Sequence, residues 1–205
     1  GTKVPLTIIK NSVSNKKERG LILRVYGAYG AITTPSFNAQ DAILLEQGYT
    51  IAYAHVRGES ILGKSWYKSG RKLKKENSIL DYISCANYLI DKGYTSSDLL
   101  IGYGNSAGGL IVAQAVNIAP SLFNTIILDH PFLDVVNTMM SDSLPLTKDE
   151  YKEWGDPKEK EIYEYIRNYS PYQNIESQPY PNVLLIASFQ DYQTPIWQVA
   201  KYCSR

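Results

Sequence analysis

Short apolar runs alternate along the chain with longer segments whose apolar residues recur at helical spacing. Such runs, when glycine, proline or polar residues end them, are typical of strands. The expected strands lie at residues 4–10, 21–26, 50–56, 99–101, 125–128 and 182–188. The first run alternates only weakly, so we expect an edge strand there. The polar residues 11–20 that follow it predict a hairpin loop.

The segments between the strands predict helices. Residues 76–92 are the clearest case, because Ile79, Ile83, Ala86 and Ile90 form one apolar stripe. Further helices are expected at 38–47, at 110–116, over 148–169 as charged surface helices broken at 155–157, and from about residue 195.

Two segments lack a clear period: residues 57–70 predict a long loop, and residues 131–146 predict an irregular excursion. Strands that alternate with helices predict an α/β fold, with a mostly parallel sheet and helices on both of its faces.

One strand–turn–helix passage carries a chemical signal. Its turn contains Gly104-x-Ser106-x-Gly108, the spacing of a nucleophile elbow, in which a strained turn exposes a serine at the end of a strand. Side chains in place of the two glycines would collide with the neighbouring strand and helix. The helix after Ser106 also offers free N–H groups to developing negative charge. The alternative is a glycine-rich turn without chemistry.

In a parallel sheet, ligands gather at the carboxyl ends of the strands. Five residues that could take part in chemistry fall at or just past such ends: Tyr26, His55, Ser106, His130 and Asp191. We therefore expect them along one rim of the sheet.

Composition narrows the class of protein. A chain of 205 residues with 44% hydrophobic and 20% charged residues fits one soluble globular domain. A formal net charge of +1 gives no reason to expect nucleic acid or an anionic membrane as a partner. With only two cysteines, Cys85 and Cys203, a reduced, cytoplasmic location is the default. No metal-ligand cluster or phosphate-binding glycine loop is evident, so we expect no cofactor and no metal.

Several strings of residues, in order along nearly the whole chain, are similar to the catalytic domain of the prolyl oligopeptidase family, with the oligopeptidase B and prolyl endopeptidase-like branches nearest. They are Val25-Tyr26-Gly27-Ala28-Tyr29-Gly30, Ala54-His55-Val56-Arg57-Gly58, Trp66-Tyr67, Lys74-Lys75-Glu76-Asn77, Gly104-Asn105-Ser106-Ala107-Gly108-Gly109, Pro131-Phe132-Leu133-Asp134-Val135-Val136, Leu144-Pro145-Leu146-Thr147, Glu153-Trp154-Gly155-Asp156-Pro157 and Tyr169-Ser170-Pro171-Tyr172.

The resemblance implies an α/β-hydrolase domain, preceded in the same full-length chain by a β-propeller that gates access to the site. By position, Ser106 resembles the nucleophile and Asp191 the acid of a catalytic triad. Tyr26 matches a tyrosine whose hydroxyl would form an oxyanion hole with the backbone N–H of Ala107. From the residues alone, Tyr26 could equally be a core tyrosine at a strand end, one of 17 in the chain, and Asp191 a loop-capping aspartate.

The resemblance also suggests substrate-binding residues: Tyr29, Glu150 and Gln193. Glu150 matches one of two glutamates that receive a basic side chain in the oligopeptidase B branch, whereas Lys152 replaces the other, so trypsin-like specificity is doubtful. Gln193 stands near the position of an arginine that holds the substrate backbone in the family; it can still donate a hydrogen bond, without charge assistance.

The family's catalytic histidine lies downstream of the acid, and no histidine follows Asp191. We therefore expect a C-terminally truncated domain over residues 1–205, without the histidine segment and without turnover by itself. His55 is expected to be structural. His130, at the correct rim but in the wrong order along the chain, is a less favoured substitute base.

These observations predict a serine-type oligopeptidase that hydrolyses peptide bonds in short peptides through an acyl-enzyme. An esterase or thioesterase of the prolyl endopeptidase-like type is the first alternative. A non-catalytic binding or regulatory protein on the same fold is the second.

Overall fold

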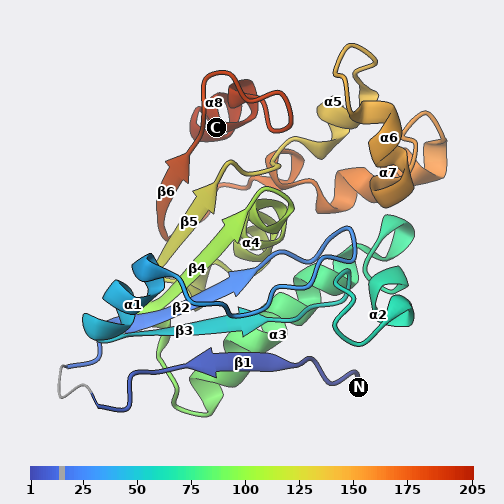
Figure 1. The fold of residues 1–205 in the computed structure, drawn as a ribbon. Coiled ribbons are helices and arrows are strands. Elements are labelled where there is room, and N and C mark those ends of the chain that lie inside the picture. The colour runs from blue at the N-terminus through green and yellow to red at the C-terminus, as the bar shows by residue number, and fades with distance from the viewer. Residues whose placement is uncertain (14–16) are drawn as a thin grey trace.

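The computed structural model describes residues 1–13 and 17–205, and its centre is a six-stranded sheet (Figure 1). The strands are β1 (Leu6–Ile9), β2 (Gly20–Val25), β3 (Tyr49–Ala54), β4 (Leu100–Asn105), β5 (Thr125–Asp129) and β6 (Asn182–Ile186). Their order across the sheet is β1-β3-β2-β4-β5-β6. Only β1 runs antiparallel to its neighbour, so the sheet is mostly parallel, as predicted.

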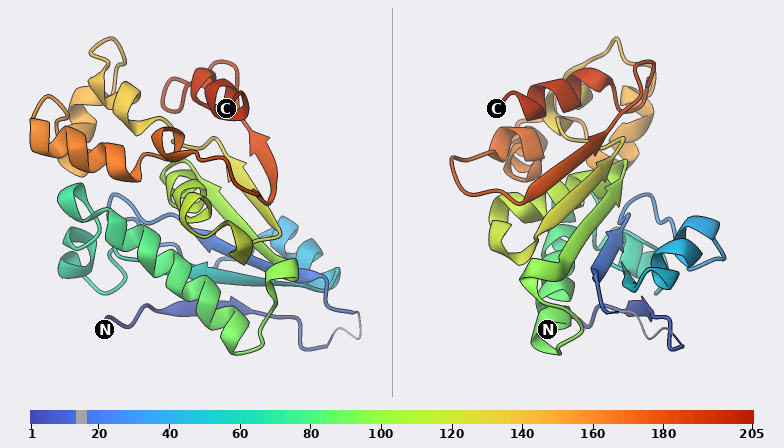
Figure 2. Two further views of the ribbon diagram at one scale, coloured as in Figure 1. Left: turned by 180° about the vertical axis from the view of Figure 1, so that it is seen from behind. Right: turned by 90° about the vertical axis from the view of Figure 1, so that its left-hand side faces the viewer.

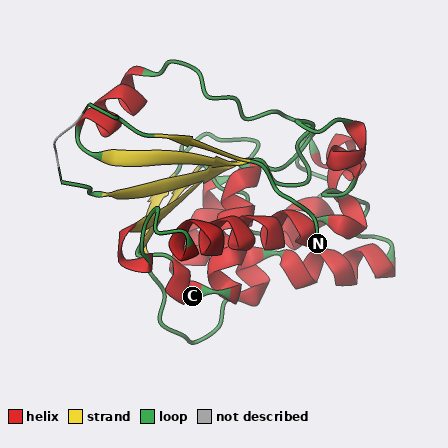
Figure 3. Ribbon diagram, turned by 90° about the horizontal axis from the view of Figure 1, so that it is seen from below, coloured by secondary structure: helices red, strands yellow, loops and turns green. Residues whose placement is uncertain are grey.

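In the described residues, eight α-helices connect the strands or extend from them. They are α1 (Ala39–Glu46), α2 (Lys64–Lys68), α3 (Glu76–Asp91), α4 (Ala107–Ile118), α5 (Val135–Met140), α6 (Thr147–Trp154), α7 (Lys160–Tyr169) and α8 (Ile196–Cys203). In Figure 2, α1 lies on one face of the sheet and α3 and α4 on the other, so both faces are covered. Figure 3 shows that most of the helices gather on a single side.

The core lies between the sheet and the helices α3 and α4. All residues of α4 from Ala107 to Val116 are buried, as expected of a helix that is apolar all round. Helix α3 buries one stripe, which includes Ile79, Tyr82 and Ala86. Tyr82 donates its hydroxyl hydrogen to the carbonyl oxygen of Leu23 at 2.8 Å, which ties α3 to the middle of β2. The sheet is thus packed against α3 and α4 along its buried face.

The strand register brings three chain segments together at this end. Val25 lies opposite Gly104, and Asn105 lies opposite Asp129. The residues that follow these strand ends are Tyr26, Ser106 and His130. Because the three strands are parallel neighbours, their next residues come to the same rim of the sheet.

Most elements confirm the sequence-based prediction, including the edge position of β1, but three predictions are wrong. Residues 11–20, of which 14–16 lie outside the described part, do not form a hairpin loop, because β3 lies between β1 and β2. The loop expected at 57–70 contains α2, and the irregular excursion at 131–146 contains α5.

Two expectations need smaller corrections. The strand expected at 99–101 begins at Leu100 and continues to Asn105. The helices expected over 148–169 are charged, but Trp154, Ile166 and Tyr169 are buried, so these helices pack on the core with one face. In the part of the chain that the structure describes, no helix is both long and apolar enough to cross a membrane.

Candidate active site

Ser106 stands in a sharp, strained turn between β4 and α4. Its φ of 51° and ψ of −118° are rare for a residue with a side chain, and the surrounding bonds hold it there. Its N–H donates to the carbonyl oxygen of Asp129 at 3.0 Å, and its own carbonyl accepts from the N–H of Phe132 at 3.0 Å. The predicted strand–turn–helix elbow is therefore present, and two hydrogen bonds to the end of β5 and the segment after it hold the turn.

The glycines of the elbow are required by close backbone contacts. A Cβ at Gly104 would lie 2.3 Å from the carbonyl oxygen of Gly108, and a Cβ at Gly108 would lie 2.2 Å from that of Val25. The second contact presses the first turn of α4 against the end of β2. It thereby places Ser106 beside Tyr26, the residue after Val25.

Tyr26 and Ala107 supply two donors close to Ser106. Ala107 is the first residue of α4, where a backbone N–H has no partner within the helix. The pKa of Tyr26 is raised overall. Burial is the largest cause, and the nearby Glu150 and Glu153 raise it further, whereas a side-chain hydrogen bond with Ser106 lowers it. The phenol therefore keeps its proton and remains a donor.

Ser106, Tyr26 and Ala107 line one pocket of about 210 Å³. The remaining lining residues are Tyr29, Phe132, Thr138, Met139, Leu144, Leu146, Thr147, Glu150, Trp154, Tyr192, Gln193 and Thr194. The three candidate substrate-binding residues, Tyr29, Glu150 and Gln193, are among them. Lys152 is exposed and absent from this lining, so its charge is not part of the pocket wall.

Glu150 is held in place by two donors. The hydroxyl of Tyr29 lies 2.6 Å from its Oε2, and the indole Nε1 of Trp154 lies 2.9 Å from the same atom. Trp154 also contacts the rings of Tyr29 and Phe132 edge-on, with centroids 5.8 and 5.3 Å apart. Burial and the hydrogen bond to Glu150 raise the pKa of Tyr29, so this phenol stays protonated and the wall carries one fixed carboxylate.

A buried lysine lies behind this wall. Lys75 is fully buried, and its Nζ donates to the carbonyl oxygen of Gly27 at 2.9 Å. The same Nζ lies 3.5 Å from Oε1 of Glu153 and 4.9 Å from the ring centroid of Trp154. Burial lowers the pKa of Lys75 to about 8, against the pull of Glu153. This group joins the loop after β2 to α6, the helix that carries Glu150.

Asp191 lies in the loop between β6 and α8. Its Oδ1 accepts from the N–H groups of Gln193 and Thr194 at 2.8 and 2.9 Å, and its Oδ2 accepts from the hydroxyl of Thr194 at 2.9 Å. Burial alone would raise its pKa, but these bonds and the nearby His130 lower the pKa overall. Asp191 is therefore ionised at neutral pH. It lines a cavity adjoining the Ser106 pocket, rather than that pocket itself.

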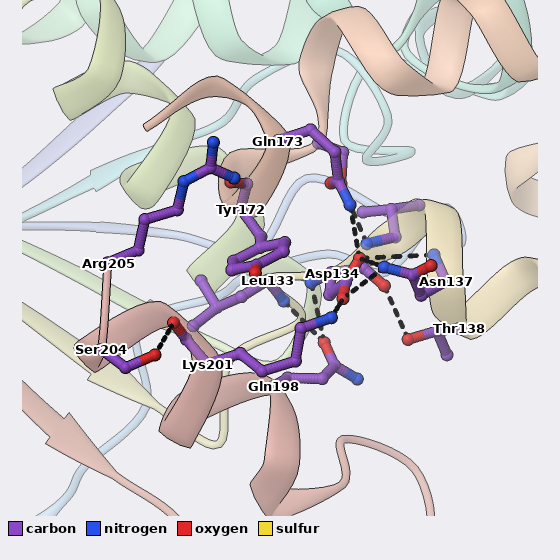
Figure 4. A network of polar contacts seen from close by, with 12 residues as sticks. Leu133, Asp134, Asn137, Thr138, Tyr172, Gln173, Gln198, Lys201, Ser204 and Arg205 are labelled. Carbon is purple, nitrogen blue, oxygen red and sulfur yellow. Dashed lines mark hydrogen bonds and ion pairs between the residues drawn. The ribbon is translucent and has the colours of Figure 1, made fainter. Parts of the chain in front are cut away.

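A polar network joins α8 to the segment after β5 (Figure 4). The Oε1 of the buried Gln198 accepts from the N–H groups of Leu133 and Asp134 at 2.9 and 3.0 Å. Lys201, on the same helix, lies 2.5 Å from Oδ2 of Asp134. The backbone N–H of Phe132, the residue before Leu133, donates to the carbonyl oxygen of Ser106. The network therefore connects α8, which follows the loop of Asp191, to the turn that holds Ser106.

Neither histidine of the chain lies in the Ser106 pocket. His55 is buried, and its ring nitrogens lie 2.8 Å from Oγ1 of Thr7 and 3.4 Å from Oε2 of Glu59. His130 contacts Asp129 and Ser188 instead of Ser106. In the described part of the chain, no group of three or more residues is arranged to hold a metal ion.

The structure brings six of the seven predicted site residues into one pocket and places the seventh, Asp191, beside it. Sequence reasoning missed Phe132, Trp154 and Thr194 as site residues, although all three lie in segments that it discussed. Their positions beside a pocket depend on how α5, α6 and α8 fold back over the sheet, which the spacing along the chain does not reveal.

Comparison with known proteins gives the class of this chain. Residues 35–205 match the model of the prolyl oligopeptidase family. Prolyl endopeptidase-like from Xenopus laevis is 43% identical over 207 residues, and dipeptidyl aminopeptidase BI from Pseudoxanthomonas mexicana is 38% identical over 205 residues. Both alignments cover the whole chain but only 29% and 28% of the relatives' length.

Solved structures agree with this assignment. Oligopeptidase B from Leishmania major superposes with a TM-score of 0.94 at 36% identity, over 99% of this chain and 28% of that one. Oligopeptidase B from Trypanosoma brucei with covalently bound antipain also gives a TM-score of 0.94, at 39% identity, over 100% of this chain and 29% of that one. The chain belongs to the prolyl oligopeptidase family, and its fold is the α/β-hydrolase fold.

Proposed function

We propose that this chain is the nucleophile-bearing part of a serine-type oligopeptidase that hydrolyses short peptides through an acyl-enzyme. The observation that carries the proposal is the position of Ser106, held in a strained elbow that lines a pocket together with Tyr26 and the start of α4. In support, the chain matches peptidases by name, although it spans under a third of their length.

In the proposed reaction, Ser106 Oγ attacks the carbonyl carbon of the scissile bond. The hydroxyl of Tyr26 and the N–H of Ala107 donate to the oxyanion of the tetrahedral intermediate. A base takes the proton from Ser106 and returns it to the leaving amine, and Asp191 orients that base. Water then hydrolyses the ester formed on Ser106.

We assign the base to a histidine outside residues 1–205. Two observations support this assignment: His55 is buried between Thr7 and Glu59, and His130 is bonded to Asp129 and Ser188. In the same full-length protein, we expect a β-propeller domain that limits access to short peptides. The cytoplasmic location expected from composition remains part of this proposal.

The pocket wall suggests how a peptide is held. Glu150 offers one carboxylate, and Gln193 offers an uncharged amide near Asp191. Trp154, Phe132, Met139 and Leu146 add apolar side chains to the wall, and Thr138, Thr147 and Thr194 add hydroxyl groups. A single carboxylate in such a wall does not provide the paired acidic contact that favours arginine or lysine, so we do not assign trypsin-like specificity.

The test uses the full-length protein and a fluorophosphonate probe, with the modified serine located by peptide mass spectrometry. We expect labelling of Ser106 that Ser106→Ala abolishes, followed by turnover of short peptides. Faster turnover of thioesters than of peptides would favour the esterase alternative. Absence of label on Ser106 in a folded protein would contradict a hydrolytic function and favour the binding or regulatory alternative.

A further inference from the structure

The chain contains a second hydroxyl–imidazole–carboxylate arrangement, separate from Ser106. His130 Nε2 lies 2.7 Å from Oγ of Ser188, and His130 Nδ1 lies 2.7 Å from Oδ1 of Asp129. The other oxygen of Asp129 accepts from the hydroxyl of Tyr103 at 2.8 Å. Burial and, to a smaller extent, this hydrogen bond to Asp129 raise the pKa of Tyr103 to about 12, so the phenol remains a donor.

Backbone pairing aligns the three residues. The N–H of His130 donates to the carbonyl oxygen of Ile186 at 2.8 Å, which extends the parallel pairing of β5 and β6 by one residue. Ser188 follows Ile186 by two residues. His130 itself has a φ of 47°, which is rare for a residue with a side chain and directs the chain away from the strand.

The hydrogen-bond partners determine which tautomer the neutral imidazole of His130 adopts. A carboxylate only accepts hydrogen bonds, so the neutral ring of His130 carries its hydrogen on Nδ1, toward Asp129. Its Nε2 then has a free lone pair, and Ser188 donates to it. This is the tautomer that a serine nucleophile requires of its base, and a carboxylate fixes the tautomer as in other such sites.

Within residues 1–205, a cavity opens onto this arrangement. Ser188 is exposed, and it lines an open cavity of about 590 Å³ together with His130 and Asp191. Pro145, Leu146 and Tyr192 supply an apolar side of the cavity. Leu146, Tyr192 and Gln193 also line the Ser106 pocket and separate the two.

We propose that Ser188, His130 and Asp129 form a second nucleophilic site, which accepts an acyl or phosphonyl group from small activated esters independently of Ser106. With an aryl ester, Ser188 Oγ forms the new bond to the carbonyl carbon and the carbon–oxygen bond of the leaving group breaks. The proton of Ser188 passes to His130 Nε2 and then to the departing phenolate. With a fluorophosphonate, the bond from Ser188 Oγ to phosphorus forms, fluoride leaves, and the proton of Ser188 passes to His130 Nε2 and then to solvent.

The test is made on the full-length protein carrying Ser106→Ala, so that the proposed function is not involved. A small fluorophosphonate and p-nitrophenyl acetate serve as probes, and peptide mass spectrometry locates and times each modification. We expect Ser188 to react at least about tenfold faster than Ser177, an exposed serine on the loop before β6. Ser188→Ala should remove this label alone.

Two further variants test the roles of the other residues. His130→Gln should lower the rate at Ser188 by about 10²-fold, because the glutamine amide cannot act as a base. Asp129→Asn should also lower it, because it no longer fixes the tautomer, and thermal melting checks that each variant is folded. The proposal is overturned if Ser188 reacts no faster than Ser177, or if a folded His130→Gln or Asp129→Asn variant keeps the full rate.

Discussion

Gly104 and Gly108 approach each other so closely that a Cβ on Gly104 would lie 2.3 Å from the carbonyl oxygen of Gly108. The contact joins the end of β4 to the first turn of α4, directly across the turn of Ser106. The atoms that a Cβ on Gly104 would meet all belong to the backbone of Gly108 and Gly109, so no flexible side chain can move aside. The strained conformation of Ser106 thus depends on two positions that lack side chains.

Gly104→Ala should therefore destabilise the protein by about 3 kcal/mol, toward the upper end of the range for overpacked interiors. Gly102→Ala, in the same strand, is the matched control. There a new Cβ would lie 3.1 Å from the hydroxyl of Tyr82 and 3.2 Å from side-chain carbons of Ile126 and Val112, which can shift. We expect a cost of about 1 kcal/mol for the control. Urea unfolding would measure both, and equal costs would contradict the argument.

Tyr26→Phe should leave the fold intact and slow the proposed hydrolysis. The hydroxyl is one of two proposed oxyanion donors, and the loss of one such donor typically lowers kcat by about 10²–10³-fold. Tyr29→Phe is a useful comparison, because it frees Glu150 from one partner without touching the oxyanion donors. Steady-state kinetics on a short peptide would separate the two variants. Equal kcat values for wild type and Tyr26→Phe would exclude the role proposed for Tyr26.

Much of this fold and site could be predicted from the sequence because the signals are local. The elbow is a five-residue pattern centred on Ser106, and each central strand contains a short apolar run. The pairing of β1 with β3 depends instead on residues more than 40 positions apart, and no local pattern encodes it. Helices α2 and α5 contain five and six residues, too few to show a helical period.

The charges around the pocket were harder to predict. Lys75 and Glu153 stand among other charged residues and resemble parts of solvated helix ends, yet both are buried. Their burial follows from the packing of Trp154 against Phe132 and Tyr29, which brings α6 over the loop after β2. Such contacts between distant segments decide which charges are excluded from water.

The buried Lys75 predicts a pH dependence of stability. Its pKa of about 8 in the folded protein lies below the ordinary value of about 10.4, because burial disfavours the charged form. Between these two pH values the unfolded chain binds more protons than the folded one, so this contribution increases stability as pH rises and is lost as pH falls toward 8. Its full size is on the order of 3 kcal/mol.

The measurement is urea unfolding between pH 7.5 and 10 for wild type and Lys75→Met. Other groups act in the opposite direction: burial raises the pKa of Cys85 to about 12, which lowers stability as pH rises through the range where the unfolded thiol ionises. The contribution of Lys75 is therefore the difference in slope between the two proteins. Parallel pH profiles would show that Lys75 does not titrate in this range.

The last prediction concerns Gln198, which connects α8 to the segment after β5. Its side chain is fully buried, and its Oε1 is the acceptor for two backbone N–H groups, those of Leu133 and Asp134. Gln198→Leu keeps an apolar stem of similar length but leaves both donors without this partner. Each buried unsatisfied donor costs about 1–3 kcal/mol, and the loss of the buried Nε2 of Gln198, which has no hydrogen-bond partner, offsets one such cost, so we expect a net loss of about 1–3 kcal/mol.

The exposed Ser204→Ala, at the end of the same helix, should change stability by less than about 0.5 kcal/mol. Because Thr194 lies two residues before α8 and donates to Asp191, loosening α8 should also increase hydrogen exchange at the amides of Gln193 and Thr194. Faster exchange at those two amides in Gln198→Leu, and not in Ser204→Ala, would indicate that the buried side chain of Gln198 holds the loop of Asp191 in position. Unchanged exchange would mean that the loop is fixed by its own bonds to Asp191.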